Sequence, residues 1–310
     1  MLYRMATVAI NAYRESVRAR VLLGLACIAF GVALYSLVVG AYTLADAPRV
    51  VSDLGAAGIS LFSIVVAVAI SATTLHRELE QKTVLPVLAR PLRRSEYLVG
   101  KYLGTMLVVL VFVMADAGIV LMMSGALAGG SLALVLGVGL GLLVVLLVAA
   151  WRWSAVATYG PIGWAAAMLV AGSLLANRAP LERSLVLSSS LLSLLEVGIV
   201  TAVATLFASF SRPFLTALLT SWVFIIGRSA DSLARLPRKF FGPTLHDMGV
   251  VLSKVFPNLQ VYVPARPLLT GESLEASLVP YLGMAAVQAV AWSIGLLALA
   301  SFIFRRRDFL

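Results

Sequence analysis

The sequence predicts an all-α membrane protein, a polytopic helix bundle with six to eight spans in a single domain, 1–310. Three observations predict it. The chain is 61% hydrophobic and 12% charged, whereas soluble domains are about 45–50% apolar and about 25% charged. Its mean hydropathy is +1.00. Apolar stretches near the length of about 20 residues that a membrane helix needs recur along the whole chain.

Residues 1–20 have an amphipathic pattern. Asn11, Arg14, Glu15 and Arg18 fall on one stripe of a helix. The apolar remainder includes Val8, Ala9, Ala12, Val17 and Ala19. Such a helix can lie in the membrane interface, with its apolar side in lipid and its arginines at the head groups. We favour this interfacial helix over a merely solvated helix start.

Eight apolar stretches follow, and we favour eight spans: 21–43, 54–75, 103–125, 131–151, 161–176, 190–210, 214–230 and 281–303. The first has 23 residues, more than the roughly 7–15 residues in the apolar h-region of a signal peptide, so we expect it to be retained. The stretch 161–176 is the weakest, because it is short and opens at Gly160-Pro161. If 131–176 is a single broken hairpin, the count falls to six. Both counts are even, so the termini should share a side.

The distribution of positive charge predicts which side that is. With eight spans, fifteen Lys and Arg residues fall in short segments on the side of the termini, and three fall on the other side. Because cytoplasmic loops accumulate Lys and Arg, we expect both termini in the cytoplasm and the chain in the cytoplasmic (inner) membrane. This distribution also explains the net charge of +10, so we expect lipid and not nucleic acid as the partner of this charge.

The long loop 231–280 is then predicted to be extracytoplasmic. It contains an amphipathic run whose apolar side is Leu245, Met248, Val251, Leu252 and Val255. Two interpretations stay open for this run: a short helix that rests on the outer surface and closes an exit, or an ordered connector.

The segment 76–101 is a polar island, with nine charges in 26 residues. Pro86 should end the helix that descends from the second span. Ser95 can then cap a new helix, with Glu96 in its first turn. An apolar strip remains on this bent cytoplasmic segment, formed by Leu79, Val84, Leu85, Val87 and Leu88. The strip favours a docking surface for a soluble partner over a plain loop.

Several kinds of chemistry are missing from the sequence. Cys27 is the single cysteine, and no His, Cys and carboxylate cluster suits a metal. No P-loop is present, because Gly100-Lys101 is followed by Tyr102 and position 95 is Ser. We therefore expect no enzyme activity and no directly bound cofactor. The energy for any active transport must come from an ion gradient or from another subunit.

Two acids, Asp116 and Glu196, lie within predicted spans. A carboxylate there costs about 2.5–3.5 kcal/mol on insertion scales, so each should face a cavity or a partner. One interpretation is a proton relay in a transport path, and the other, which we favour, is hydrogen bonding between helices. Gly137 and Gly141 have the GxxxG spacing that lets membrane helices approach closely.

Three blocks in the polar island resemble the permease subunits of type 2 ABC transporters. The blocks are Arg77-Glu78-Leu79-Glu80-Gln81-Lys82-Thr83, then Leu88-Ala89-Arg90-Pro91, then Arg94, Tyr97, Gly100, Lys101 and Gly104. Residues 13–18, 207–214, 256–259 and 304–308 also resemble parts of that family. The chain departs from the family pattern in 126–190, where it carries an extra pair of hydrophobic stretches beyond the family's usual six spans.

The resemblance implies a homodimer or heterodimer of permeases bound to two ATPase subunits, which hold ATP and Mg. The segment 76–101 would be the coupling helix. Its implied contacts with the ATPase are Arg77, Glu78, Glu80, Lys82, Thr83, Leu85, Leu88, Arg90 and Pro91. Two other functions stay open: an ion-coupled secondary transporter that uses Asp116 and Glu196, and a membrane scaffold that recruits an ATPase.

Overall fold

The computed structural model describes residues 2–17, 20–43, 46–80, 93–235, 238–271 and 277–305. Within these residues the chain is helical and contains no strand. The long helices are α1 (Leu2–Val17), α2 (Arg20–Ala41), α3 (Ala47–Glu80), α5 (Arg94–Leu127), α6 (Leu132–Arg152), α7 (Ser154–Leu175), α8 (Pro180–Ala208), α9 (Pro213–Arg228), α11 (Arg238–Val255) and α13 (Leu278–Arg305). The short ones are η1 (Ala176–Arg178), α10 (Ala230–Ala234), η2 (Gln260–Tyr262) and α12 (Arg266–Thr270).

Seven of the described helices are long and apolar enough to cross a membrane: α2, α3, α5, α6, α7, α8 and α13. They confirm the predicted polytopic bundle. The predicted span 214–230 corresponds to α9, which is apolar but has only 16 residues. At 1.5 Å per residue it is about 24 Å long, shorter than the hydrocarbon layer of about 30 Å.

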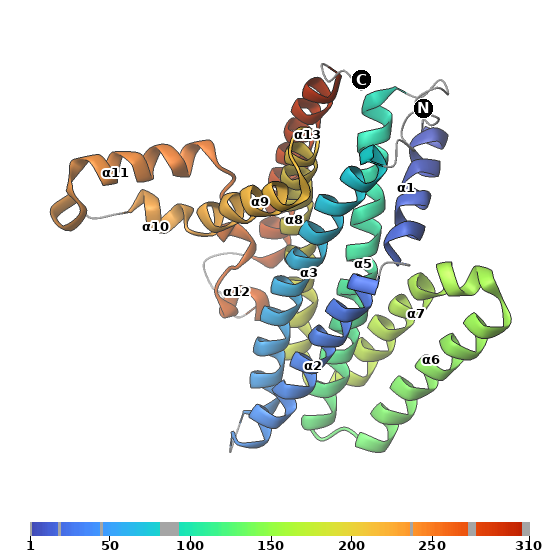
Figure 1. Cartoon of the computed structure of the whole chain (residues 1–310). Helices are drawn as coiled ribbons and strands as arrows, with labels where there is room; N and C mark the ends of the chain where they lie inside the picture. The colour runs from blue at the N-terminus through green and yellow to red at the C-terminus, as the bar shows by residue number, and fades with distance from the viewer. Residues whose placement is uncertain are drawn as a thin grey trace.

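The chain must nevertheless return from the end of α8 to the beginning of α13. The last turns of α8 and α13 share one buried cluster, which includes Leu206, Ala208, Ala300 and Phe304, so both helices finish at the same end. The chain after Ala208 must therefore return to the opposite end before α13 begins, and α9 starts this return. Figure 1 shows that α1 begins and α13 ends at one end of the bundle. The even count of crossings stays a prediction.

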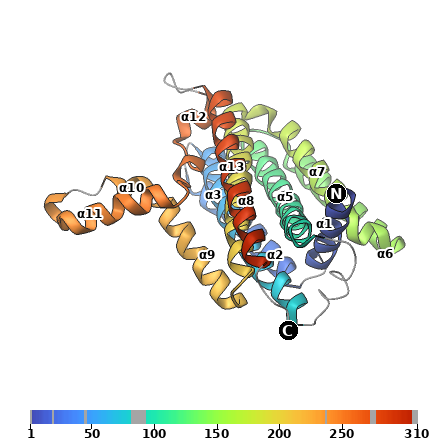
Figure 2. The same ribbon diagram turned by 90° about the horizontal axis from the view of Figure 1, so that it is seen from above.

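Helix α8 lies at the centre of the bundle and is the most buried of the seven, packed by α3, α5 and α13. The α6–α7 hairpin, which accounts for the extra hydrophobic pair in 126–190, packs on α5 through α7. Helix α6 is almost wholly exposed, and an apolar helix that is exposed all round is typical of contact with lipid. Figures 1 and 2 show the hairpin on one side of the bundle and the α10–α11 arm on the other.

Helix α7 corrects the start of the predicted span 161–176, because it begins at Ser154 and passes through Pro161. Proline removes one backbone hydrogen bond, and its ring crowds the β-carbon of the preceding residue. That residue is Gly160, which has no β-carbon, so the crowding is relieved and the helix continues.

The start of α5 corrects the predicted cap at Ser95. Arg93 occupies the N-cap position, and Ser95 lies inside the first turn. Glu96, predicted correctly for that turn, accepts a hydrogen bond at 3.2 Å from the Arg93 backbone N–H. Because the Glu96 side chain reaches back to this free N–H, the helix begins two residues earlier than a cap at Ser95 would allow.

The predicted GxxxG contact is not made within the described chain. A β-carbon on Gly137 or Gly141 would meet no atom within 4 Å, because α6 is exposed. The closest helix approach involves other glycines, at the crossing of α5 and α7. A β-carbon on Gly118 would lie 2.6 Å from the Met168 carbonyl oxygen, and one on Gly172 would clash with the Gly118 backbone.

The amphipathic run in the long loop forms α11, and its apolar residues Met248, Val251 and Val255 are exposed. The helix packs on α10 and α9 and projects sideways from the bundle (Figure 2). These contacts favour the ordered connector, because α11 does not cover the end of the bundle in this chain. The side of the membrane on which 231–280 lies stays a prediction.

Candidate functional site

The first turn of α5 holds the last turn of α13. The Arg94 guanidinium donates hydrogen bonds to the carbonyl oxygens of Phe304 at 3.1 Å and Arg305 at 3.0 Å. The last carbonyls of a helix have no partner inside it and carry partial negative charge, so a guanidinium is well suited to them. Tyr97, one turn later, stacks on the Phe304 ring with centroids 6.3 Å apart.

The next two turns of α5 receive α1. A β-carbon on Gly100 would lie 2.6 Å from the Val8 β-carbon, and one on Gly104 would lie 2.6 Å from the Ala9 carbonyl oxygen. The two glycines therefore allow the helix backbones to approach closely. Helix α1 runs beside the start of α5 (Figure 1). Val8 and Ala12, predicted to face lipid, are buried; the position of α1 relative to the interface stays a prediction.

Lys101 lies between these glycines, 7% exposed. Its ammonium group pairs with Glu15 of α1 at 3.2 Å. Glu15 belongs to the polar stripe of residues 1–20, but the sequence pattern does not reveal its partner, because the two residues are 86 positions apart. Arg14, on the same stripe, hydrogen-bonds the Tyr159 hydroxyl of α7. The polar stripe of α1 is thus partly used inside the protein.

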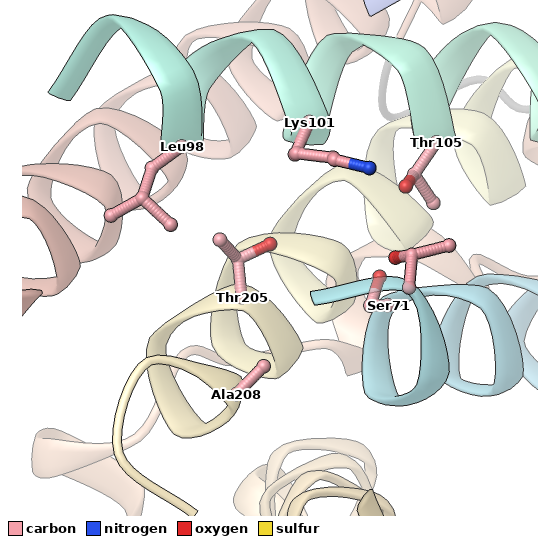
Figure 3. Close-up of a pocket in the computed structure, with 7 residues that line it drawn as sticks. Ser71, Leu98, Lys101, Thr105, Thr205 and Ala208 are labelled. Atoms are coloured by element: carbon pink, nitrogen blue, oxygen red, sulfur yellow. The ribbon is translucent and has the colours of Figure 1, made fainter. Parts of the chain in front are cut away.

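Behind Lys101 is a very small cavity lined by Ser71, Thr74, Leu98, Lys101, Thr105, Thr205 and Ala208. Figure 3 shows side chains of α3, α5 and α8 converging on it. Its volume, about 10 Å³, approaches what one water molecule requires. The Ser71 hydroxyl is buried there without a hydrogen-bond partner among the described residues. This polar spot is where α3, α5 and α8 meet.

We name these contacts the terminal junction: Glu15 of α1, Arg94, Tyr97, Gly100, Lys101 and Gly104 of α5, and Phe304 of α13. The junction joins the two ends of the chain to the beginning of α5. It contains every residue of the third block that the sequence singled out. The block is therefore explained by packing between helices that are distant in sequence.

The first block begins at the end of α3. Arg77, Glu78 and Glu80 belong to its last turn, because α3 continues to Glu80. The other predicted contacts, Lys82, Thr83, Leu85, Leu88, Arg90 and Pro91, lie outside the described residues, as does the predicted helix end near Leu85. The predicted coupling segment 76–101 therefore begins in the last turns of α3 and ends within the terminal junction.

Of the two intramembrane acids, Glu196 has an evident partner. It is fully buried on α8, and Arg228, on the last turn of α9, donates to its two carboxylate oxygens from Nε at 2.6 Å and Nη2 at 2.7 Å. Nη2 also donates to the Ser60 hydroxyl of α3 at 2.8 Å. Arg228 falls near the end of the predicted span 214–230, and α9 brings it to α8.

Asp116 is 6% exposed on α5. Among the described residues it makes no hydrogen bond or ion pair. The structure therefore does not bring the two acids into one hydrogen-bonded chain within the part that it describes. In that same part, no group of three or more His, Cys, Asp or Glu side chains is arranged to hold a metal ion.

Seven long apolar helices, with α8 at their centre, define a multi-pass membrane protein. The chain belongs to the ABC-2 family of transporter proteins, whose sequence profile matches residues 6–309. This confirms the resemblance to type 2 ABC transporter permeases. No curated protein matches the chain closely enough to narrow the assignment further.

Proposed function

We propose that the chain is the membrane-spanning subunit of an ATP-driven exporter, powered by a separate ATPase subunit. Membership of the ABC-2 family supports the transport role, and the lack of a P-loop in the sequence supports a separate ATPase. ATP and Mg would be held by that partner and not by this chain.

The terminal junction is the observation that carries the proposal. The coupling segment 76–101 ends in Arg94, Tyr97 and Lys101, and these side chains contact α13 and α1. A displacement of the segment by a docked ATPase would therefore be passed to both ends of the chain and not absorbed by a flexible loop. Packed helices transmit such displacements because they are rigid.

The residues proposed to contact the ATPase are those of the first two blocks, from Arg77 to Pro91. The active unit is proposed to be a dimer of permeases, either a homodimer or a heterodimer, in the cytoplasmic membrane with both termini in the cytoplasm. The exposed apolar surfaces of α2, α9 and α13 are available for lipid and for a second permease.

The proposal is tested by reconstituting the chain with its ATPase in proteoliposomes. The variant Glu78→Gln/Glu80→Gln removes two charges from the end of α3. We expect it to lose ATPase binding and ATP-driven transport and to keep its melting temperature. Asp46→Asn, at the opposite end of the same helix, is the matched control and should keep all three.

Transport that continues without any ATPase, and that stops with a proton uncoupler, would overturn the proposal in favour of an ion-coupled transporter that uses Asp116 and Glu196. An ATPase that binds normally but is stimulated by no substrate would instead favour the scaffold. The bidentate pairing of Glu196 with Arg228 weighs against a proton-relay role, because both carboxylate oxygens already accept hydrogen bonds from one guanidinium.

A further inference from the structure

A second and much larger cavity lies toward the end of the bundle opposite the terminal junction. It is lined by α3, α8, α9 and the residues around η2 and α12, it is partly open, and its volume is about 340 Å³. Small-molecule sites in proteins usually have volumes of about 300–1,000 Å³. The cavity is therefore large enough for a drug-sized molecule.

The wall of this cavity is mostly apolar. Its apolar residues include Ala57, Leu61, Ile64, Leu185, Phe224 and Leu269, which come from four different elements. Such a wall favours a hydrocarbon chain or ring, because each buried CH₂ group is stabilised by leaving water. A fully polar ligand would gain little from it.

The charged groups at the cavity are already neutralised by one another. Arg228 is paired with Glu196, and Arg266 is paired with Asp53 and Glu182. Arg49 also lies near Asp53 on α3, so three arginines face three carboxylates. An ionic ligand would bring an uncompensated charge into this balanced and largely apolar site, which is unfavourable.

Two groups at the cavity can each donate a further hydrogen bond. The Ser193 hydroxyl lines the cavity on a residue that is 3% exposed, and it has no partner among the described residues. Arg228 uses Nε and Nη2 in its bonds to Glu196 and Ser60, and in the same part of the chain its Nη1 makes none. Both groups can donate to an oxygen, and buried donors are usually paired.

We propose that this cavity binds an uncharged amphiphile. Its apolar part would lie along Leu61, Ile64 and Phe224, and a neutral oxygen would accept hydrogen bonds from Arg228 and Ser193. As a substrate class for transport, the inference rests on the proposed exporter function. The binding itself requires neither the ATPase nor ATP.

The test uses three probes with the same ten-carbon chain and different charge. They are 1-decanoylglycerol, decanoate and decyltrimethylammonium, and their binding to the purified chain in detergent is measured at pH 8 by native mass spectrometry. We expect saturable binding of decanoylglycerol, with both ions weaker on the order of tenfold or more. Equal binding of all three, tighter binding of either ion, or no saturable binding would overturn the proposal.

Variants then locate the site. Ala57→Trp should fill the cavity and abolish saturable binding, and Val65→Trp, on an exposed part of α3 outside the cavity, should leave it unchanged. If Ala57→Trp does not fold, Ser193→Ala decides, with an expected loss of about two- to tenfold for one neutral hydrogen bond. Unchanged binding in the folded variants would overturn the location.

This experiment is independent of ATP-driven transport. Saturable binding of decanoylglycerol by a chain that shows no ATP-driven transport would contradict the exporter and leave the cavity assignment intact. ATP-driven transport by a chain that binds none of the three probes would contradict the cavity assignment and leave the exporter proposal intact.

Discussion

Charged side chains inside this membrane bundle mostly have partners of opposite charge on other helices. Glu196 has its partner on α9, and Lys101 has its partner on α1. Removing one member of a buried pair leaves an uncompensated charge, which costs more than the pair itself contributes. Changing a single charged residue should therefore have a measurable electrostatic effect on stability.

The first prediction concerns the buried pair. Arg228→Met should destabilise the protein by about 3–5 kcal/mol, because it leaves the Glu196 carboxylate buried without a cation. Adding Glu196→Gln should recover much of this loss. The measurement is thermal unfolding in detergent of the two single variants, the double variant and the wild type. Single variants as stable as the wild type would show that the pair has no such role.

The second prediction concerns Tyr13, which is buried on α1 with a hydroxyl that lacks a hydrogen-bond partner among the described residues. Burial, together with Tyr159 nearby, raises the pKa of Tyr13 from 10.0 to about 12. A raised folded-state pKa gives stability that is complete below the unfolded pKa. This stability is lost as pH rises through the folded value, here between pH 10 and about 12.

Tyr13→Phe removes both the unpaired hydroxyl and the titration. We expect its melting temperature to be no lower than that of the wild type at pH 8, and its advantage to grow as the pH passes 10. Tyr42→Phe, at an exposed position, is the control and should follow the wild type at every pH. An advantage for Tyr13→Phe that stays constant with pH would contradict the pKa shift.

At the scale of elements, glycines decide which helices approach closely. Gly100 and Gly104 admit α1, and Gly118 and Gly172 bring α5 and α7 together. The glycines of α6 have open space around them. Spacing alone did not separate these cases, because Gly100 and Gly104 have the same four-residue separation as Gly137 and Gly141.

The third prediction tests the docking of α1. Gly104→Val should displace α1 from α5, because even a β-carbon there would lie 2.6 Å from Ala9 and Ala12 atoms. We expect a lower melting temperature and faster proteolysis of residues 2–17 in detergent. Gly141→Ala is the control, with an expected gain of up to about 1 kcal/mol from helix propensity. Equal behaviour of the two variants would contradict the docking.

At the scale of the whole molecule, the terminal junction brings α1, the beginning of α5 and the end of α13 together at one end of the bundle (Figure 1). The large cavity lies toward the opposite end. Helix α5 carries the junction and packs on α3, and α3 lines the large cavity. Under the proposed function, an input at the coupling segment would therefore have a packed route to the cavity.

The fourth prediction tests this route. Arg94→Met removes the hydrogen bonds to the end of α13, so it should reduce ATP-driven transport while ATPase binding is retained. A coupling change of about 0.5–2 kcal/mol corresponds to about two- to thirtyfold. Arg183→Met, which removes a hydrogen bond to Asn177 away from the junction, should have little effect. Loss of ATPase binding in Arg94→Met would indicate a docking role instead.

Much of the fold could be predicted from the sequence. Each predicted span falls on a described helix, because a bilayer requires about 20 apolar residues per crossing and this signal is local. The errors were also local. The span 161–176 began too late because Gly160 relieves the crowding by Pro161, and the cap at Ser95 was wrong because Glu96 binds the Arg93 N–H.

The candidate site was also predicted only in part. The third block was recognised from its residues, but the reasons for Arg94, Gly100 and Lys101 lie on α1 and α13. The pairing of Arg228 was not predicted, because nothing near it in the sequence indicates Glu196. Contacts between residues that are far apart in the chain leave no periodic pattern, so local reasoning does not find them.

By itself, the sequence determined that this is a polytopic helical membrane protein of the ABC-2 family, with a polar segment after its second span. Hydrophobic length and motif spacing are properties of neighbouring residues. The tertiary structure alone decided which charges neutralise one another, which glycines are contacts and where a cavity remains. These depend on which helix faces lie together, and packing of the whole bundle sets that.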